Sequence, residues 1–162
     1  MNIRLLIASL LILLGIRRAS SSTSSTALAR PTQSGASRAC DSQGCGYYGA
    51  SRGSRTHIGV DYIAQPGERI SSPIHGTVSR HPRPYINDSK YSGIEIQGTG
   101  VHSSYLVKIF YISPISAGRA VKPGEYIGSA QNIAAKYPSI TPHIHVELYR
   151  NGSHVDISKL IQ

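Results

Sequence analysis

The sequence is short of several features that would assign it to other protein classes. It contains only two cysteines, so a scaffold held together by several disulfides is excluded. It has no internal repeat, which argues against a solenoid or propeller array. It has neither a helix-turn-helix pattern nor a basic stripe interleaved with aromatic residues, so nucleic acid is a poor candidate partner.

Long apolar runs are also scarce, and the one that occurs, Leu5–Ile16, follows Arg4. A bilayer-spanning helix needs about 20 apolar residues. The run is too short for a stable membrane span and is typical of the apolar part of a secretory signal. We therefore predict a signal peptide over residues 1–19 and a secreted, extracellular protein, with an uncleaved signal anchor as the alternative.

Composition divides the rest of the chain into two parts. Residues 20–38 are rich in Ser, Thr, Ala and Gly, have little to bury, and are predicted to form a disordered linker. Residues 39–162 are numerous enough for one modest hydrophobic core, so we predict a single domain there. Asn87 and Asn151 each begin an N-glycosylation sequon.

The formal net charge of +9 overstates the charge of the domain. Several of the arginines precede Cys40, and from that residue onward the charge is about +4. Four arginines of the domain either form a basic patch for an anionic glycan or receptor, or belong to an ordinary solvated surface. They are Arg52, Arg55, Arg80 and Arg83.

The two cysteines, Cys40 and Cys45, are separated by four residues and flanked by Gly44 and Gly46, which permit a tight loop. In an exported protein this spacing favours a disulfide that closes a small loop. The alternative is a pair of thiolate ligands for zinc, although no further cysteine or histidine lies close by in the sequence.

Short runs of β-forming residues punctuated by glycine and proline predict an all-β antiparallel sandwich or open barrel. The Asn151-Gly152 pair predicts a tight hairpin turn, and only residues 131–137 suggest a helical turn. The expected strands are 58–63, 69–71, 75–80, 92–97, 104–112, 125–129 and 143–149.

Two short motifs, His57-x-Gly59-x-Asp61 and His143-x-His145, carry the chemistry of the chain. Side chains alternate between the two faces of a strand, so His57 and Asp61 share one face, as do His143 and His145. Two imidazoles and a carboxylate that converge with one position left open are typical of catalytic zinc. The other histidines are expected to be ordinary polar residues: His75, His81, His102 and His154.

The segments around these motifs resemble the lysostaphin-type zinc metalloendopeptidases. They are residues 55–61 (RTHIGVD), 66–67 (PG), 72–78 (SPIHGTV), 121–128 (VKPGEYIG) and 142–147 (PHIHVE). Residues 40–46 and 107–115 look more like a chemotaxin-like secreted branch of vertebrates. The resemblance implies the open-barrel fold called the duplicated hybrid motif, a local Cys40–Cys45 bridge, and a Zn²⁺ cofactor held by His57, Asp61 and His145.

The same resemblance implies that His143 is the general base in an active enzyme. Those enzymes use one further histidine, on a Tyr-x-His-Leu strand, where this chain has Ser113. A serine carries no positive charge, and losing one such donor costs on the order of a hundred- to a thousandfold in rate. His102 is the alternative donor, and residues 80–92 are a candidate loop over the groove.

We therefore expect a zinc-binding, non-catalytic protein of extracellular recognition, with a cell-surface receptor, a glycan or peptidoglycan as partner. The alternative is an active metalloendopeptidase that cleaves glycine-rich peptides or peptidoglycan cross-bridges. Binding of peptidoglycan without cleavage lies between the two.

Overall fold

The computed structural model describes residues 26–162, and the predicted signal peptide and the first part of the predicted linker lie outside that range. Within it the chain consists of strands and three 3₁₀ turns, with no α-helix. The all-β prediction is confirmed. No helix among these residues is long and apolar enough to cross a membrane.

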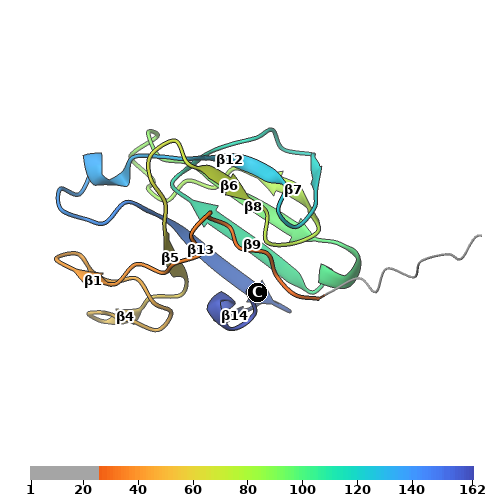
Figure 1. Cartoon of the computed structure of the whole chain (residues 1–162), viewed down its shortest axis with the longest axis horizontal. Coiled ribbons are helices and arrows are strands. Elements are labelled where there is room, and N and C mark those ends of the chain that lie inside the picture. The colour runs from red at the N-terminus through yellow and green to blue at the C-terminus, as the bar shows by residue number, and fades with distance from the viewer. Residues whose placement is uncertain (1–25) are drawn as a thin grey trace, which may run out of the picture.

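A seven-stranded antiparallel sheet forms the larger layer (Figure 1). Its main path runs β11-β7-β8-β9-β13-β14, and β5 joins β13 beside β14. The strands are β5 (Val60–Ile63), β7 (Gly76–Arg80), β8 (Gly93–Gly98), β9 (Tyr105–Phe110), β11 (Ala120–Val121), β13 (His143–Arg150) and β14 (Ser153–Val155).

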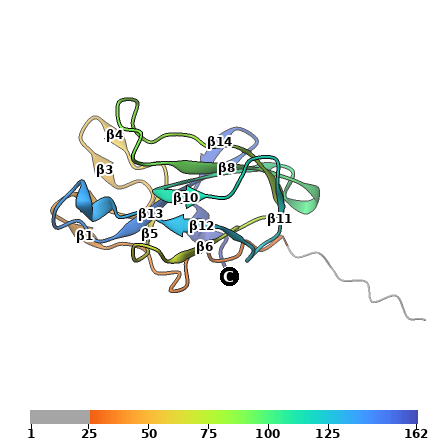
Figure 2. The ribbon, with the colours of Figure 1, turned by 90° about the horizontal axis from the view of Figure 1, so that it is seen from above.

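A second sheet of three strands, in the order β10-β12-β6, forms the smaller layer (Figure 2). Its strands are β6 (Arg69–Ser71), β10 (Ile112–Pro114) and β12 (Tyr126–Ala130). Ile70, Ile112 and Ile127 from this sheet are fully buried in one core cluster with residues of β8, β9 and β13. The predicted sandwich is therefore present.

Successive side chains of β13 point to opposite faces of the large sheet, so one face belongs to the core and the other carries the histidines. Ile144, Val146 and Leu148 are fully buried and belong to the core cluster. Because side chains alternate, His143 and His145 lie on the opposite face. The pairing register places His145 beside Asp61 of β5 on one side and beside Phe110 of β9 on the other.

Two small hairpins lie together at one end of the molecule (Figures 1 and 2). The first joins β1 (Cys40–Asp41) to β2 (Gly44–Cys45), and the second joins β3 (Ser51–Arg52) to β4 (Arg55–Thr56). Cys40 and Cys45 are disulfide-bonded, so the structure carries the predicted bridge rather than two free thiols.

The expected strands match the observed ones to within about two residues, with one informative difference. The run predicted as one strand over 104–112 is two strands, β9 and β10, which belong to different sheets. Tyr111 lies between them with φ of 64°, in the left-handed region. A β-branched-rich run gives no sign of such a turn, so the break was missed. The predicted helical turn is present at Ile133–Ala135.

The prediction of a disordered linker is wrong for residues 26–38, the part of the linker that the structure describes. Leu28 is 1% exposed and forms a parallel bridge with Ile161 near the C-terminus. At the other end of the segment, the Arg38 amide donates to the Asp61 carbonyl at 2.7 Å. A few buried side chains and backbone hydrogen bonds order this segment, although its composition is typical of disorder. We call residues 26–38 the strap.

Candidate metal centre

The pairing of β5 with β13 brings the two predicted motifs together. Asp61 lies directly opposite His145 in the register, and His57 precedes β5. Gly59, between them, permits the close approach, because a Cβ there would lie 2.6 Å from the Val146 carbonyl oxygen and 2.7 Å from the His145 ring. Only glycine fits at this position without displacing β13.

Three side-chain atoms form a nearly equilateral triangle. Asp61 Oδ1 lies 2.9 Å from His145 Nδ1 and 3.2 Å from His57 Nε2, and the two nitrogens are 3.0 Å apart. Both His57 and Asp61 are buried, and the side chain of His145 is 15% exposed. The triangle is therefore largely closed to solvent.

This donor set fits a zinc ion. Tetrahedral zinc with ligand distances near 2.0–2.1 Å separates its ligands by about 3.3 Å, close to the three observed distances. Two imidazoles and one carboxylate suit zinc by chemical type as well. A neutral His57 has one N–H, which the Tyr47 carbonyl oxygen accepts from Nδ1, so its Nε2 presents a lone pair to the triangle as a metal ligand does.

Electrostatics favours an ionised carboxylate at the centre. Burial by itself would raise the pKa of Asp61, but hydrogen bonds from His145 and His57 outweigh it and lower the pKa. Burial would likewise lower the pKa of His145, whereas hydrogen bonds to Asp61 and Glu147 raise it. Asp61 is thus ionised at neutral pH, as a metal-binding carboxylate must be.

Each side chain of the triangle is oriented by a second contact. The Nδ1 atom of His57 lies 2.9 Å from the Tyr47 carbonyl oxygen, and the Nε2 atom of His145 lies 3.3 Å from a Glu147 carboxylate oxygen. Arg38 binds the other oxygen of Asp61, Oδ2, at 2.9 Å. Such outer contacts fix ring orientation and tautomer in metal sites.

His143 lies beside the triangle rather than in it. Its Nε2 atom is 3.8 Å from Asp61 Oδ1, and its Nδ1 atom is 2.7 Å from the Thr141 carbonyl oxygen. The side chain is buried, and this desolvation lowers the pKa of His143. A neutral imidazole held by a carbonyl has its second nitrogen free to accept a proton.

A tyrosine occupies the space next to His143. The ring of Tyr111 meets the His143 ring edge-on, with 5.6 Å between centroids. Tyr85, from the loop predicted to cover the groove, reaches Tyr111 with 3.2 Å between the two hydroxyl oxygens. Burial raises the pKa of Tyr111, so its phenol stays neutral. Ser113, in contrast, is exposed and pairs with Ser129 of β12.

The alternative role for His102 is wrong. His102 precedes β9, whereas the residue of β9 opposite His145 is Phe110, at the other end of that strand. A strand rises about 3.4 Å per residue, which places His102 far beyond reach of the triangle. It is fully buried, and its Nδ1 atom accepts a hydrogen bond from the His75 amide at 2.9 Å.

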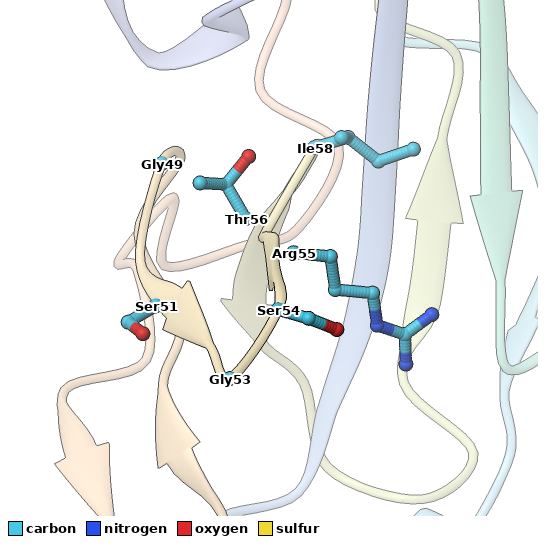
Figure 3. A pocket seen from close by; sticks show the side chains of 7 residues that line it. All are labelled: Gly49, Ser51, Gly53, Ser54, Arg55, Thr56 and Ile58. Carbon is cyan, nitrogen blue, oxygen red and sulfur yellow. The ribbon is translucent and has the colours of Figure 1, made fainter.

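The four arginines do not form one free basic patch. Arg80 is paired with Glu95 at 2.6 Å, and Arg52 donates to the Cys45 carbonyl at 2.6 Å. Arg55 forms no ion pair within residues 26–162, and Figure 3 shows it reaching away from the β3–β4 hairpin on the side opposite Ser51. The hairpin borders an open hollow of about 510 Å³ lined mainly by small residues.

Sequence reasoning missed three residues of the site: Arg38, Tyr111 and Glu147. Arg38 was assigned to the linker, and Tyr111 was treated as one more residue of a strand. Glu147 carried a usable signal, because it lies two residues after His145 and so on the same face of β13. The other two depend on contacts between distant segments, which spacing does not encode.

Comparison with known proteins agrees with this geometry. Residues 55–157 match the model of peptidase family M23. Leukocyte cell-derived chemotaxin-2 of Mus musculus is 40% identical over 111 residues, which cover 68% of this chain and 71% of the relative.

Two solved structures share the fold at low sequence identity. A zinc containing peptidase from Vibrio cholerae superposes with a TM-score of 0.56 at 21% identity, covering 82% of this chain and 39% of that one. The solution structure of lysostaphin gives a TM-score of 0.53 at 21% identity, covering 70% of this chain and 46% of that one. This chain thus spans less than half of either protein.

Proposed function

This chain belongs to peptidase family M23, and we propose that within the family it is a secreted zinc-binding protein of extracellular recognition without efficient peptidase activity. Support for secretion comes from the disulfide and from the similarity to chemotaxin-2. The proposed partner is a cell-surface receptor or a glycan, including peptidoglycan.

His57, Asp61 and His145 would hold the zinc ion. When bound, zinc would polarise a carbonyl group and lower the pKa of a bound water. In the non-catalytic protein it would tie β5 and the segment before it to β13, and so stabilise the native state by ligand linkage. The short distances within the triangle and its low exposure support this structural role.

One observation supports the proposal that catalysis is inefficient: the side chain packed beside His143 is neutral. Hydrolysis of a peptide bond needs a donor that stabilises the developing negative charge. The group packed against His143 is the ring of Tyr111, with a neutral phenol. Ser113 is exposed and also uncharged at neutral pH. The cation that acts on His143 and Tyr111 is Arg38, and its guanidinium is already engaged by Asp61, Asp41 and the Gly44 carbonyl.

A second candidate function, peptide-bond hydrolysis, is favoured by His143 itself. Its neutral, carbonyl-bound ring lies 3.8 Å from the ligand Asp61 and has the properties of a general base. In this function His143 would accept the proton of the attacking water. The substrate class would be glycine-rich peptides or peptidoglycan cross-bridges.

One experiment separates the two functions. The purified protein, including the strap, is analysed for zinc and incubated with pentaglycine-containing peptidoglycan, with and without a chelator. Stoichiometric zinc without new amino termini supports the recognition protein, and binding to the sedimented cell wall then tests a glycan partner. Cleavage that needs zinc and disappears in His143→Ala, but persists in His154→Ala, establishes the enzyme instead.

A further inference from the structure

Arg38, the last residue of the strap, is buried beside the candidate metal centre, and each of its three side-chain nitrogens donates a hydrogen bond. It is 3% exposed. Its Nε and Nη2 atoms donate to Asp61 Oδ2 at 3.3 and 2.9 Å. Its Nη1 atom donates to the Gly44 carbonyl at 2.8 Å and lies 2.6 Å from Asp41 Oδ2.

The two oxygens of the Asp61 carboxylate therefore have different partners. Oδ2 is engaged by the guanidinium, while Oδ1 faces the two histidines at 2.9 and 3.2 Å. A free carboxylate rotates, and it can also bind a metal through both oxygens. A planar, rigid guanidinium removes that freedom.

The disulfide hairpin supports Arg38 from the other side. Gly44 and Asp41 both lie within the loop that the Cys40–Cys45 bridge closes. Asp41 also accepts a hydrogen bond from the Thr141 amide at 3.1 Å. The loop, the guanidinium and Asp61 therefore form one continuous set of polar contacts, in which Arg38 hydrogen-bonds both the loop and the Asp61 carboxylate.

A positioning role and a purely electrostatic effect of Arg38 predict opposite changes in metal affinity when the side chain is removed. A positive charge beside Asp61 repels a cation, so charge alone predicts tighter metal binding when Arg38 is removed. If Arg38 instead holds Oδ1 in place, its removal weakens binding. The sign of the change in affinity separates the two effects.

We propose that Arg38 is a positioning residue, which orients Asp61 as a one-oxygen ligand and links the disulfide hairpin to the metal centre. The proposal rests on the proposed binding of zinc by His57, Asp61 and His145. Contacts of this kind are typically worth about 10- to 100-fold in metal affinity.

Arg52 offers a matched control. Its Nη2 atom lies 3.9 Å from the same oxygen, Asp61 Oδ2, beyond hydrogen-bond distance, and it donates to the Cys45 carbonyl instead. Arg52→Met therefore removes an equal charge from the same neighbourhood without removing a hydrogen bond to the ligand.

The test is a zinc titration of metal-stripped wild type, Arg38→Met and Arg52→Met in competition with a chromophoric chelator. We expect the zinc Kd of Arg38→Met to rise at least about tenfold, and that of Arg52→Met to stay unchanged or fall. An Arg38→Met protein that binds zinc as tightly as wild type, or more tightly, overturns the proposal.

Bound Co²⁺ supplies a readout that a merely structural role would not change, because its visible bands depend on the number and arrangement of its ligands. The spectrum should change in Arg38→Met and not in Arg52→Met. Unchanged spectra in both variants overturn the positioning role even if Arg38→Met melts at a lower temperature.

Two further measurements decide the cases in which a variant does not fold or zinc does not bind. If Arg38→Met does not fold, Arg38→Lys decides, because it keeps the charge but loses the planar fork; wild-type affinity in that variant refutes the proposal. If wild type itself binds no zinc, the proposed function fails together with this inference. Failure in the variants alone leaves zinc binding intact.

Discussion

Two ends of the large sheet each hold a pair of neighbouring histidines, and only one pair resembles a metal site. At one end the rings of His57 and His145 lie 4.8 Å apart between centroids, and at the other those of His75 and His102 lie 5.5 Å apart. Asp61 lies within 3.2 Å of both rings of the first pair. The second pair has no carboxylate among its contacts in residues 26–162.

The difference shows that two adjacent histidines do not by themselves make a cation site. The Asp61 carboxylate supplies negative charge and draws one nitrogen of each ring toward a common point. At the other end a backbone amide occupies His102 Nδ1, and burial lowers the pKa of His102. That imidazole therefore contributes as a neutral, buried side chain.

Replacement of Asp61 should have the largest effect on stability and zinc binding, because it removes the carboxylate that distinguishes one histidine pair from the other. At zinc concentrations about 100-fold above Kd, bound zinc adds about 2.7 kcal/mol to the free energy of unfolding. We expect chelation to lower the melting temperature of wild type by roughly 10 °C, and Asp61→Ala to remove this dependence on zinc. Calorimetry with and without chelator measures both. Unchanged melting curves would rule out a structural zinc ion.

Substitution of Gly59 by alanine should give the next largest effect. The added Cβ would lie 2.6 Å from a carbonyl oxygen of β13, so β5 and β13 must separate. We expect a loss of about 2 kcal/mol in stability and at least about tenfold weaker zinc binding. Gly76→Ala is the matched control, because a Cβ there would lie 2.5 Å from the Gln97 carbonyl oxygen, a similar crowding at a position outside the triangle. Normal zinc affinity in Gly59→Ala would show that the triangle tolerates wider spacing.

Substitution of His102 by asparagine should destabilise the fold without affecting zinc. The imidazole is fully buried and hydrogen-bonded to the His75 amide, so we expect about 1 kcal/mol of destabilisation. Denaturant unfolding in chelator and a zinc titration measure the two quantities. Weaker zinc binding in this variant would mean that the two ends of the sheet are coupled.

A pH dependence at the His102 end should be the smallest effect. Burial holds the pKa of His102 below the unfolded value near 6.5. The unfolded state then binds more protons, so this contribution is present above pH 6.5 and is lost as the pH falls. The rings that face His102 are His75 and Tyr105.

The difference in stability between wild type and His102→Asn, measured at pH 5 and pH 8, isolates that contribution. The groups of the metal centre are common to both proteins and cancel. We expect wild type to lose more stability on acidification than the variant. Equal losses would show that His102 does not titrate differently in the two states.

The sequence predicted the fold class and most strand positions, because glycine and proline mark the turns and alternation marks the faces. Strand spacing brought out His57, Asp61, His143 and His145 as candidates, and the family resemblance separated His57, Asp61 and His145, the residues of the triangle, from His143. Arg38 was misassigned because local composition describes a segment's own side chains and not the surface on which it packs. Tyr111 was missed because a left-handed residue within an apolar run leaves no pattern.

The bridge between Leu28 and Ile161 has a consequence for the connectivity of the domain. Backbone hydrogen bonds join Leu28 to Leu160 and to Gln162, so the two ends of the described chain lie side by side. Such proximity permits circular permutation. A short linker between the ends, with new termini opened at the exposed turn around Gly118, should preserve the strap, both sheets and the triangle.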